Sequence, residues 1–386
     1  MAEQTISPDL GFVKEVISSG GESLKKCFQC ATCSVVCNVT PDGTPFPRKE
    51  MIYAQWGLKD KLISNPDVWL CHQCSDCTAY CPRGAKPGEV LNTIRKMAIK
   101  EYSAPSFLAK MVGDPKFLVV LFAIPVLIIL AVLSYNGTLS DIPRGEDGGI
   151  VYSKFFPIHP TQFGIDFVFP LAFVFAVLCF VFGVKKYWAA MSKGVKLKGD
   201  LAGSIKAVIS DVLSHSRFKK CNVTKARSTS HLLVFYAFIG LAITTAWAVA
   251  YLYGSEFFGI KPFAIFHFGE SPYPLYDPLK LVGNVSALAL LVGIMLVITN
   301  RLKNAEKAGP GSYYDWLFIF VVFGIMATGL LSELFRLADI AALAYPTYFT
   351  HLVFIFFLFA YAPFSKMAHM IYRATAMVFA KEAGRE

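Results

Sequence analysis

The sequence of 386 residues is poor in charge, since Asp, Glu, Lys and Arg make up only 17% of it. It also contains no G-x-S-x-G element, no Walker loop and no glycine fingerprint of a dinucleotide-binding fold. These absences argue against hydrolytic catalysis and mean that any flavin would be carried by a partner. Residues 1–26 lack the apolar stretch of a signal peptide, so we expect the N-terminal region to stay in the cytoplasm.

Ionisable residues are nearly absent from the middle of the apolar runs. Glu333, Arg336 and Asp339 lie at the end of one run rather than at its centre. A redox-driven transporter or ion pump needs such residues near the bilayer midplane. The sequence therefore disfavours that class of function.

Apolar residues, by contrast, make up 55% of the chain and gather in long runs after residue 110. Six of these runs come near the ~20 residues that a helix needs to cross a bilayer. The runs are Phe117–Tyr135, Ile165–Val184, Leu232–Tyr253, Leu281–Thr299, Tyr313–Leu331 and Thr347–Ile371. We expect a mainly α-helical protein, with residues 1–110 as a ferredoxin-like head and residues 111–386 as a six-helix transmembrane bundle.

The net charge of +10 is better explained by membrane topology than by nucleic-acid binding. Three segments on one side (185–230, 300–312 and 366–386) hold 18 Lys and Arg. The three loops on the other side (136–164, 254–280 and 332–346) hold 5. Because cytoplasmic loops carry the excess of positive charge, the head, the basic loop 185–230 and the C-terminus should all face the cytoplasm, from an inner membrane.

Within the basic loop, apolar residues recur at helical spacing from Leu197 to Val212. This pattern predicts an amphipathic helix that either lies on the membrane surface or packs under the head. His215 and Arg217 follow directly, and they are candidates for hydrogen bonding to a quinone or for proton transfer. The alternative for His215 is a solvated side chain at the interface. We predict no other catalytic residue.

Eight of the ten cysteines lie within residues 27–81, in two runs that share the spacing C-x2-C-x2-C-x3-C. In a reducing compartment, cysteines this dense bind metal more often than they form disulfides. Zinc usually takes two C-x-x-C pairs that lie well apart, whereas four cysteines within eleven residues fit a [4Fe–4S] cubane. The runs therefore predict the two clusters of a bacterial-type ferredoxin.

In that pattern the fourth cysteine of each run crosses to the other cluster. Cluster 1 is expected to use Cys27, Cys30, Cys33 and Cys81. Cluster 2 is expected to use Cys71, Cys74, Cys77 and Cys37. Pro82 follows Cys81, but Asn38 follows Cys37, so we expect a looser turn after the first run.

Three histidines fall at membrane depth, where an ionisable residue indicates function. His231 opens the third run and His369 closes the sixth at the same cytoplasmic depth, so the two can hold one b haem between them. His351 lies about 27 Å from His369 along a straight helix, which is too far to share that haem. A second haem would need His351 together with His267 or, alternatively, His159. Otherwise His351 only makes a hydrogen bond at the interface.

At this point the chain resembles a known family along most of its length. Residues 1–110, whose cysteine runs end in Cys81-Pro82-Arg83-Gly84, resemble the small iron–sulfur subunit of heterodisulfide reductase. Residues from about 117 onward resemble its haem-bearing membrane subunit. The stretch from His351-Leu352-Val353 through Pro363-Phe364-Ser365 to His369 resembles the haem helix of the nitrate reductase gamma subunit. Fused in this order, the modules resemble the membrane-anchored component (QmoC) of the quinone-interacting membrane-bound oxidoreductases of sulfate reducers.

The resemblance implies electron exchange with menaquinone, soluble flavin and iron–sulfur partner subunits (QmoA- and QmoB-like) and a link to adenylylsulfate reductase in sulfate reduction. It also implies that His231 and His369 hold the haem nearer the cytoplasm and that His351 is one ligand of a distal haem. Leu241 stands near the position of the other distal ligand, which puts that second haem in doubt. The alternative function is a haem-free membrane anchor for a ferredoxin-like head.

Overall fold

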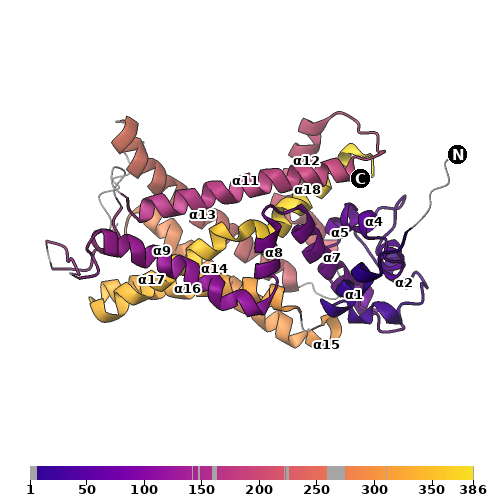
Figure 1. Cartoon of the computed structure of the whole chain (residues 1–386), viewed down its shortest axis with the longest axis horizontal. Helices are drawn as coiled ribbons and strands as arrows, with labels where there is room; N and C mark the ends of the chain where they lie inside the picture. The colour runs from indigo at the N-terminus through magenta and orange to yellow at the C-terminus, as the bar shows by residue number, and fades with distance from the viewer. Residues whose placement is uncertain are drawn as a thin grey trace.

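The computed structural model describes residues 7–140, 142–146, 148–158, 163–220, 222, 226–258, 274–309 and 311–385. Within these residues every regular element is a helix, which confirms the mainly α-helical class. Figure 1 shows long helices side by side at one end of the molecule and a head of short helices at the other. The C-terminal helix α18 returns to the head end of the long helices (Figure 1).

The head is built around one longer helix, α7. The helices of the head are α1 Leu10–Ser18, the 3-10 turn η1 Glu22–Lys26, α2 Thr32–Val35, α3 Arg48–Gln55, α4 Lys59–Ile63, α5 Asp67–Leu70, α6 Asp76–Ala79, α7 Pro87–Tyr102 and α8 Ser106–Val112. Helix α7 begins with Pro87 at its first position, where the missing N–H costs nothing. Its buried residues Val90, Leu91, Ile94 and Ala98 recur at helical spacing and form the centre of the head core. Helix α3 begins directly after Pro47.

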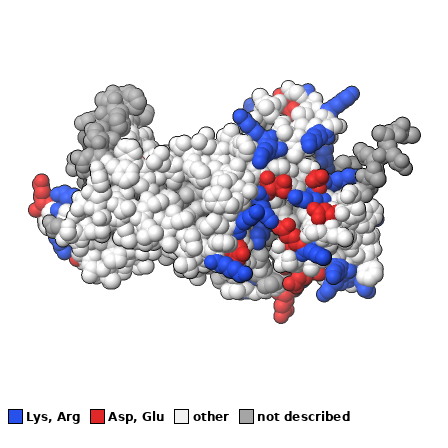
Figure 2. All heavy atoms as spheres, in the orientation of Figure 1, with Lys and Arg blue, Asp and Glu red and all other residues white. Residues whose placement is uncertain are grey.

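Among the described residues after the head, six helices are long and apolar enough to cross a membrane. These spans are Pro115–Tyr135, Ile165–Met191, Arg227–Tyr251, Pro278–Lys303, Tyr313–Leu337 and Ala341–Ala360. The helices are η2 Pro115–Phe117, α9 Leu118–Tyr135, α10 Tyr152–Phe155, α11 Ile165–Met191, α12 Leu201–Ser214, η3 Ser216–Lys220, α13 Ala226–Phe258, α14 Pro278–Lys303, α15 Ala305–Ala308, α16 Tyr313–Leu337, α17 Ala341–Ala360, η4 Ala362–Phe364, η5 Lys366–Ala368 and α18 His369–Glu382. In Figure 2 the charged residues gather over the head and at the far end, with an uncharged belt between. The chain is thus a membrane protein by the length and composition of its helices.

The long helices pack in a row. Helix α13 lies along α14, α14 touches α16, α16 lies along α17, and α17 contacts both α9 and α11. A small second core between α13, α14 and α16 includes Ala237, Leu290 and Val322. The larger core runs without a break from the head through α9, α11, α17 and α18. The head is therefore packed on the membrane domain rather than tethered to it.

The sixth helix ends earlier than the sequence predicts. Helix α17 stops at Ala360, two 3-10 turns follow, and α18 begins anew at His369. The Ser365 side chain accepts a hydrogen bond from the Met367 N–H at 3.2 Å and so caps the second turn. Tyr314 on α16 donates to the Phe364 carbonyl at 3.0 Å and holds the break in place. The expectation of one straight helix over Thr347–Ile371 was wrong.

Helix α18 joins the head to the membrane domain. Tyr372 stacks on Trp69 of α5 with ring centroids 5.4 Å apart. Beyond the end of α18, the Arg385 guanidinium lies 2.7 Å from both carboxylate oxygens of buried Asp67. Glu382 is buried as well and accepts a hydrogen bond from Ser204 of α12 at 2.8 Å. The C-terminal segment thus ties three parts of the fold together.

The amphipathic segment of the basic loop forms α12, which packs on α18. Its buried residues are Ser204 and Val208. A second stripe at i, i+4 spacing stays exposed, and it consists of Leu201, Ile205, Ile209 and Leu213. One face of α12 therefore packs inside the protein, while an apolar face remains uncovered.

Candidate functional site

The first cysteine set comprises Cys27, Cys30, Cys33 and Cys81. The chain bends between successive cysteines through left-handed conformations at Gln29 (φ 62°) and Ala31 (φ 68°), and α2 begins directly afterwards. All four cysteines line one hollow in the head. The pKa of Cys33 is raised to about 11, first by burial and then by the neighbouring thiols of Cys27, Cys30 and Cys81. The set is partly open to solvent, because Cys30 is exposed.

The second set comprises Cys71, Cys74, Cys77 and Cys37. The same bends recur at Gln73 (φ 52°) and Ser75 (φ 69°), and α6 follows as α2 does in the first run. Burial raises the pKa of Cys77 well above its ordinary value, with the thiols of Cys71, Cys74 and Cys37 as further causes. The structure thus brings the eight thiols together in the two sets that the spacing predicts, while their ligation of clusters stays a prediction.

No three His, Cys, Asp or Glu side chains in the described ranges lie close enough together to hold a single metal ion. That finding concerns single ions. The four irons at the corners of a cubane hold their thiolates farther apart than one tetrahedral ion does.

Three arginines from distant parts of the chain surround the second cysteine loop. Arg95 of α7 donates to the Cys71 carbonyl at 2.6 Å and to the Val68 carbonyl at 2.7 Å. Arg227, at the start of α13, donates to the carbonyl of Gln73. Arg373 of α18 donates to the ring of His72. Sequence reasoning missed these arginines, because no spacing links α7, α13 and α18.

The charges of these arginines act together on one residue, His72. It is only 5% exposed, and its pKa is lowered well below the usual value, first by burial and then by the charges of Arg373, Arg217, Arg227 and Arg95. The ring edge of His72 meets Phe218 of η3 at a centroid distance of 4.9 Å. Phe218 in turn contacts the His231 ring at 4.6 Å. A short row of rings therefore leads from the second cysteine loop to the first membrane histidine.

His231 and His369 come together at the head-side end of the bundle, close enough for the charge of one to act on the other. His231 lies five residues inside α13, and its Nδ1 is 3.1 Å from Nε2 of His215. His369 is the first residue of α18, and its Nδ1 is 2.5 Å from the Lys366 carbonyl oxygen. Since a carbonyl only accepts, Nδ1 of His369 carries the proton and Nε2 keeps its lone pair. In both rings Nδ1 has a protein partner.

The two residues chosen as quinone candidates lie beside this pair. His215 is only 4% exposed, so the expectation of a solvated side chain was wrong. It caps α12 in a left-handed conformation (φ 51°) that turns the chain back towards α13. Arg217 lies 3.7 Å from the carboxylate of Asp211. The structure therefore presents His215 chiefly as the partner of His231.

His351 lies in the middle of α17, and not at the membrane interface that its alternative role requires. Its Nδ1 is 3.0 Å from the Ile325 carbonyl and 3.1 Å from the Thr328 hydroxyl, both on α16. Its expected partners, His267 and the alternative His159, lie outside the described residues. Leu241 packs against the small core between α13, α14 and α16. The described residues thus give His351 a hydrogen-bonding partner but do not show a second haem ligand.

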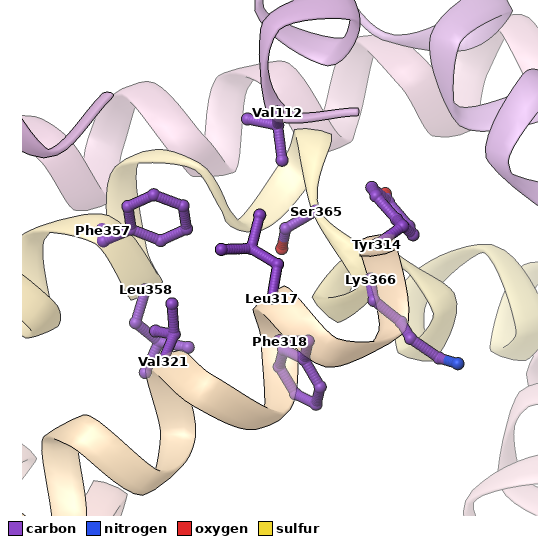
Figure 3. Close-up of a pocket in the computed structure, with 9 residues that line it drawn as sticks. All are labelled: Val112, Tyr314, Leu317, Phe318, Val321, Phe357, Leu358, Ser365 and Lys366. Atoms are coloured by element: carbon purple, nitrogen blue, oxygen red, sulfur yellow. The ribbon is translucent and has the colours of Figure 1, made fainter. Parts of the chain in front are cut away.

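A small apolar pocket lies where α8, α16 and α17 meet. Figure 3 shows Leu317 and Phe357 facing each other across it, while the Lys366 ammonium points away from them. That ammonium forms an ion pair with Asp315, a buried carboxylate at the start of α16. Asp315 also accepts a hydrogen bond from Asn92 of α7 at 3.1 Å. The pocket offers apolar surface, and its lysine is already paired with Asp315, the carboxylate that links α16 to α7 of the head.

Comparison with known proteins bears mainly on the head. A family model described as a 4Fe-4S dicluster domain matches residues 23–85. The C-type subunit of the H(2):CoB-CoM heterodisulfide,ferredoxin reductase of Methanothermobacter marburgensis is 39% identical over 102 residues, which cover 25% of this chain and 54% of that protein. A protein of Archaeoglobus profundus, named for its likeness to the C-type subunit of heterodisulfide reductase, is 36% identical over 96 residues, or 24% of this chain and 51% of that protein. The chain thus spans about half the length of these relatives.

One relative extends over the membrane domain as well. Citrate utilization protein B of Escherichia coli is 22% identical over 373 residues, which cover 92% of this chain and 89% of that protein. No solved structure matches the chain. These similarities support a role in electron transfer through 4Fe–4S clusters.

Proposed function

We propose that this chain is the membrane-bound electron-transfer subunit of an oxidoreductase complex. It would pass electrons between menaquinone and soluble flavin and iron–sulfur subunits, by way of one or two b haems and two [4Fe–4S] clusters. The observation that carries the proposal is the row His72–Phe218–His231, with centroid distances of 4.9 and 4.6 Å. This row of rings runs between the second cysteine set and the paired membrane histidines. Two consecutive redox centres of an electron path must lie near each other in this way.

The tautomers of His231 and His369 fit a haem whose iron is bound by two imidazoles. A histidine that binds iron through Nε2 usually donates its Nδ1 proton to a fixed partner. His369 has such a partner in the Lys366 carbonyl, and His231 has one in His215. His351 has the same arrangement with the Ile325 carbonyl, so it suits a distal haem if His267 or His159 supplies the second nitrogen. When bound, a b haem supplies one-electron chemistry at the membrane.

The two cysteine sets also fit the groups that they would bind, since four thiols from two short runs gather in each set, as a [4Fe–4S] cluster needs. The chain's own residues hold these groups, bury the inner one and leave the outer one near solvent. By resemblance, the soluble partners are QmoA- and QmoB-like subunits, and the complex serves adenylylsulfate reductase. The 18-to-5 excess of Lys and Arg on the head side supports a cytoplasmic head in an inner membrane.

The decisive experiment is a dithionite-reduced minus oxidised spectrum of the purified full chain, with iron and haem counted per chain. We expect about eight irons of cluster origin and a low-spin haem. The variants His231→Ala and His369→Ala should both lose the head-side haem and keep the clusters. His351→Ala is the matched control, since it should spare that haem. A chain without a Soret band would establish the haem-free anchor instead.

Quinone chemistry needs its own test, because a haem spectrum does not report on it. A photoreactive menaquinone analogue should label the head-side region near His215 and Arg217. Labelling confined to loops at the far end of the bundle would overturn this placement. Co-purification from solubilised membranes tests the soluble partners and the link to adenylylsulfate reductase.

A further inference from the structure

The ring of His72 has one nitrogen with a partner and one without. Its Nε2 is in contact with the Arg373 guanidinium. Its Nδ1 is buried and has no hydrogen-bond partner in the described part of the chain. A buried polar atom that lacks a partner is rare in proteins and calls for an explanation.

The contact with Arg373 fixes which nitrogen carries the proton. A guanidinium donates hydrogen bonds and never accepts them. Nε2 of His72 must therefore present its lone pair to Arg373, and the neutral ring then carries its proton on Nδ1. The orphan atom is a donor, and burying a donor without an acceptor is costly.

We infer that Nδ1 of His72 donates a hydrogen bond to a sulfur of the second cluster, and that Arg373 acts as the positioning residue that fixes this tautomer. The inference rests on the proposed cluster at Cys71, Cys74, Cys77 and Cys37. His72 directly follows Cys71, so its ring lies in the loop that carries three of these four thiols. Thiolates and sulfides of a cluster are negatively charged acceptors, which is the partner that the orphan donor lacks.

The residues around His72 also favour the reduced form of the second cluster. Arg95 binds the carbonyl of Cys71, and Arg227 binds that of Gln73, so two more guanidinium groups face this loop. Reduction adds an electron to a cluster that is already anionic. Hydrogen bonds to its sulfurs and nearby positive charge stabilise the reduced form and raise the reduction potential. His72 and Arg373 therefore raise the reduction potential of the second cluster, which adjoins the membrane histidines.

The first half of the head contains a natural comparison. Phe28 follows Cys27 as His72 follows Cys71, and Arg83 lies over the Phe28 ring at 4.3 Å. Each half thus pairs an aromatic ring with an arginine, but a phenyl ring has no proton to donate. The first cluster should lack this hydrogen bond, and it serves as a reference within the same molecule.

The test is an EPR-monitored redox titration of the full chain in detergent, which follows both clusters in one sample. The variant Cys30→Ser identifies the signal of the first cluster. We expect His72→Phe to lower the reduction potential of the second cluster relative to that of the first. The equilibrium between the two clusters should shift at least tenfold, which is about 59 mV for one electron. Arg373→Met should shift it in the same direction, and Arg373→Lys should restore part of the change because it keeps the charge. Phe28→Ala should leave both potentials in place.

Unchanged potentials in His72→Phe and Arg373→Met, or equal shifts of both clusters, would overturn the inference. A second readout does not depend on potentials. Pulsed EPR of the reduced wild-type protein in deuterated water should reveal an exchangeable hydrogen coupled to the second cluster, and this signal should be missing in His72→Phe. If His72→Phe fails to assemble that cluster, the wild-type signal and Arg373→Met still decide. A wild-type chain with no iron would instead refute the proposed function.

Discussion

The two halves of the head share a backbone and differ in what surrounds it. Cys27-Phe28-Gln29-Cys30 and Cys71-His72-Gln73-Cys74 both pass through a left-handed glutamine before the second cysteine, with φ of 62° and 52°. Both then continue into a four-residue helix, α2 or α6. A left-handed conformation is costly for a non-glycine residue. Its repetition in both halves indicates that the cysteine geometry requires it.

The surroundings differ because the second cysteine loop contacts the membrane domain through Arg227, Arg373 and Phe218. In the first half, Phe28 is 67% exposed and Val35 is 82% exposed. In the second half, His72 is 5% exposed and Cys71 is 7% exposed. A duplicated loop has thus become an outward-facing site and an inward-facing one through contacts made by other parts of the chain. The predictions below test whether that division is real.

The largest expected effect separates a buried cysteine from an exposed one. Cys77→Ser should abolish the second cluster, removing about four irons per chain, and should loosen the contact between α6 and α7. Cys30→Ser should disturb only the first cluster, because its side chain lies at the surface. Iron analysis and limited proteolysis of the head measure both effects. Equal loss of iron and equal protease sensitivity in the two variants would contradict the division.

The second-largest effect is expected where the C-terminal segment contacts the second half of the head. Arg385→Ala removes one partner of Asp67, whose side chain is fully buried. Breaking a buried ion pair in this way typically costs about 3 kcal/mol, and Lys49, which lies 2.7 Å from the same carboxylate, should moderate the loss. The measurement is urea-dependent proteolysis of the full chain. Arg83→Ala in the first half is the matched control, and a surface position should change stability by less than about 0.5 kcal/mol.

Much of this division lies beyond what the sequence can predict. The grouping of the eight thiols into two sets was predictable, because the cysteines stand in two short runs of fixed spacing. The apolar runs likewise predicted six membrane-spanning helices. The arginines around His72 were not, since α7, α13 and α18 meet only in the fold. The role of His215 was also missed, because a left-handed cap at the end of α12 decides where its ring points.

The break after α17 shows a second limit. Pro363 stands inside an apolar run, but so do Pro125 and Pro170, and those two lie within continuous helices. Proline alone therefore did not reveal the end of the helix. The hydrogen bonds of Ser365 and Tyr314 stabilise the break, and both depend on packing against neighbouring elements.

A smaller effect should appear as a pH dependence near the second half. Burial raises the pKa of Glu50 to about 7, while Lys49 opposes the shift and Asp67 adds to it. A raised pKa means that the folded state holds the proton more tightly. The stability that this provides is complete below about pH 4.5 and is lost as the pH rises through about 7. The wild-type head should lose about 2 kcal/mol between pH 5 and 7, and Glu50→Gln should flatten that slope. A slope that persists in Glu50→Gln would assign the effect to another group.

The smallest effect on stability is expected at the outward-facing half, and there function should change instead. Phe28→Ala removes an exposed ring, so unfolding should change by less than about 0.5 kcal/mol. The same ring lies beside the exposed Cys30, at the surface where a soluble redox partner has the shortest approach to the first cluster. Loss of an aromatic anchor at an interface often costs about 1–2 kcal/mol, or about tenfold in affinity. Stopped-flow electron exchange between the full chain and the proposed soluble partner subunits measures this. His72→Phe is the matched control, since a residue buried on the membrane side should leave partner binding unaltered. If partner affinity falls with His72→Phe but not with Phe28→Ala, then the outward and inward assignments of the two halves are reversed.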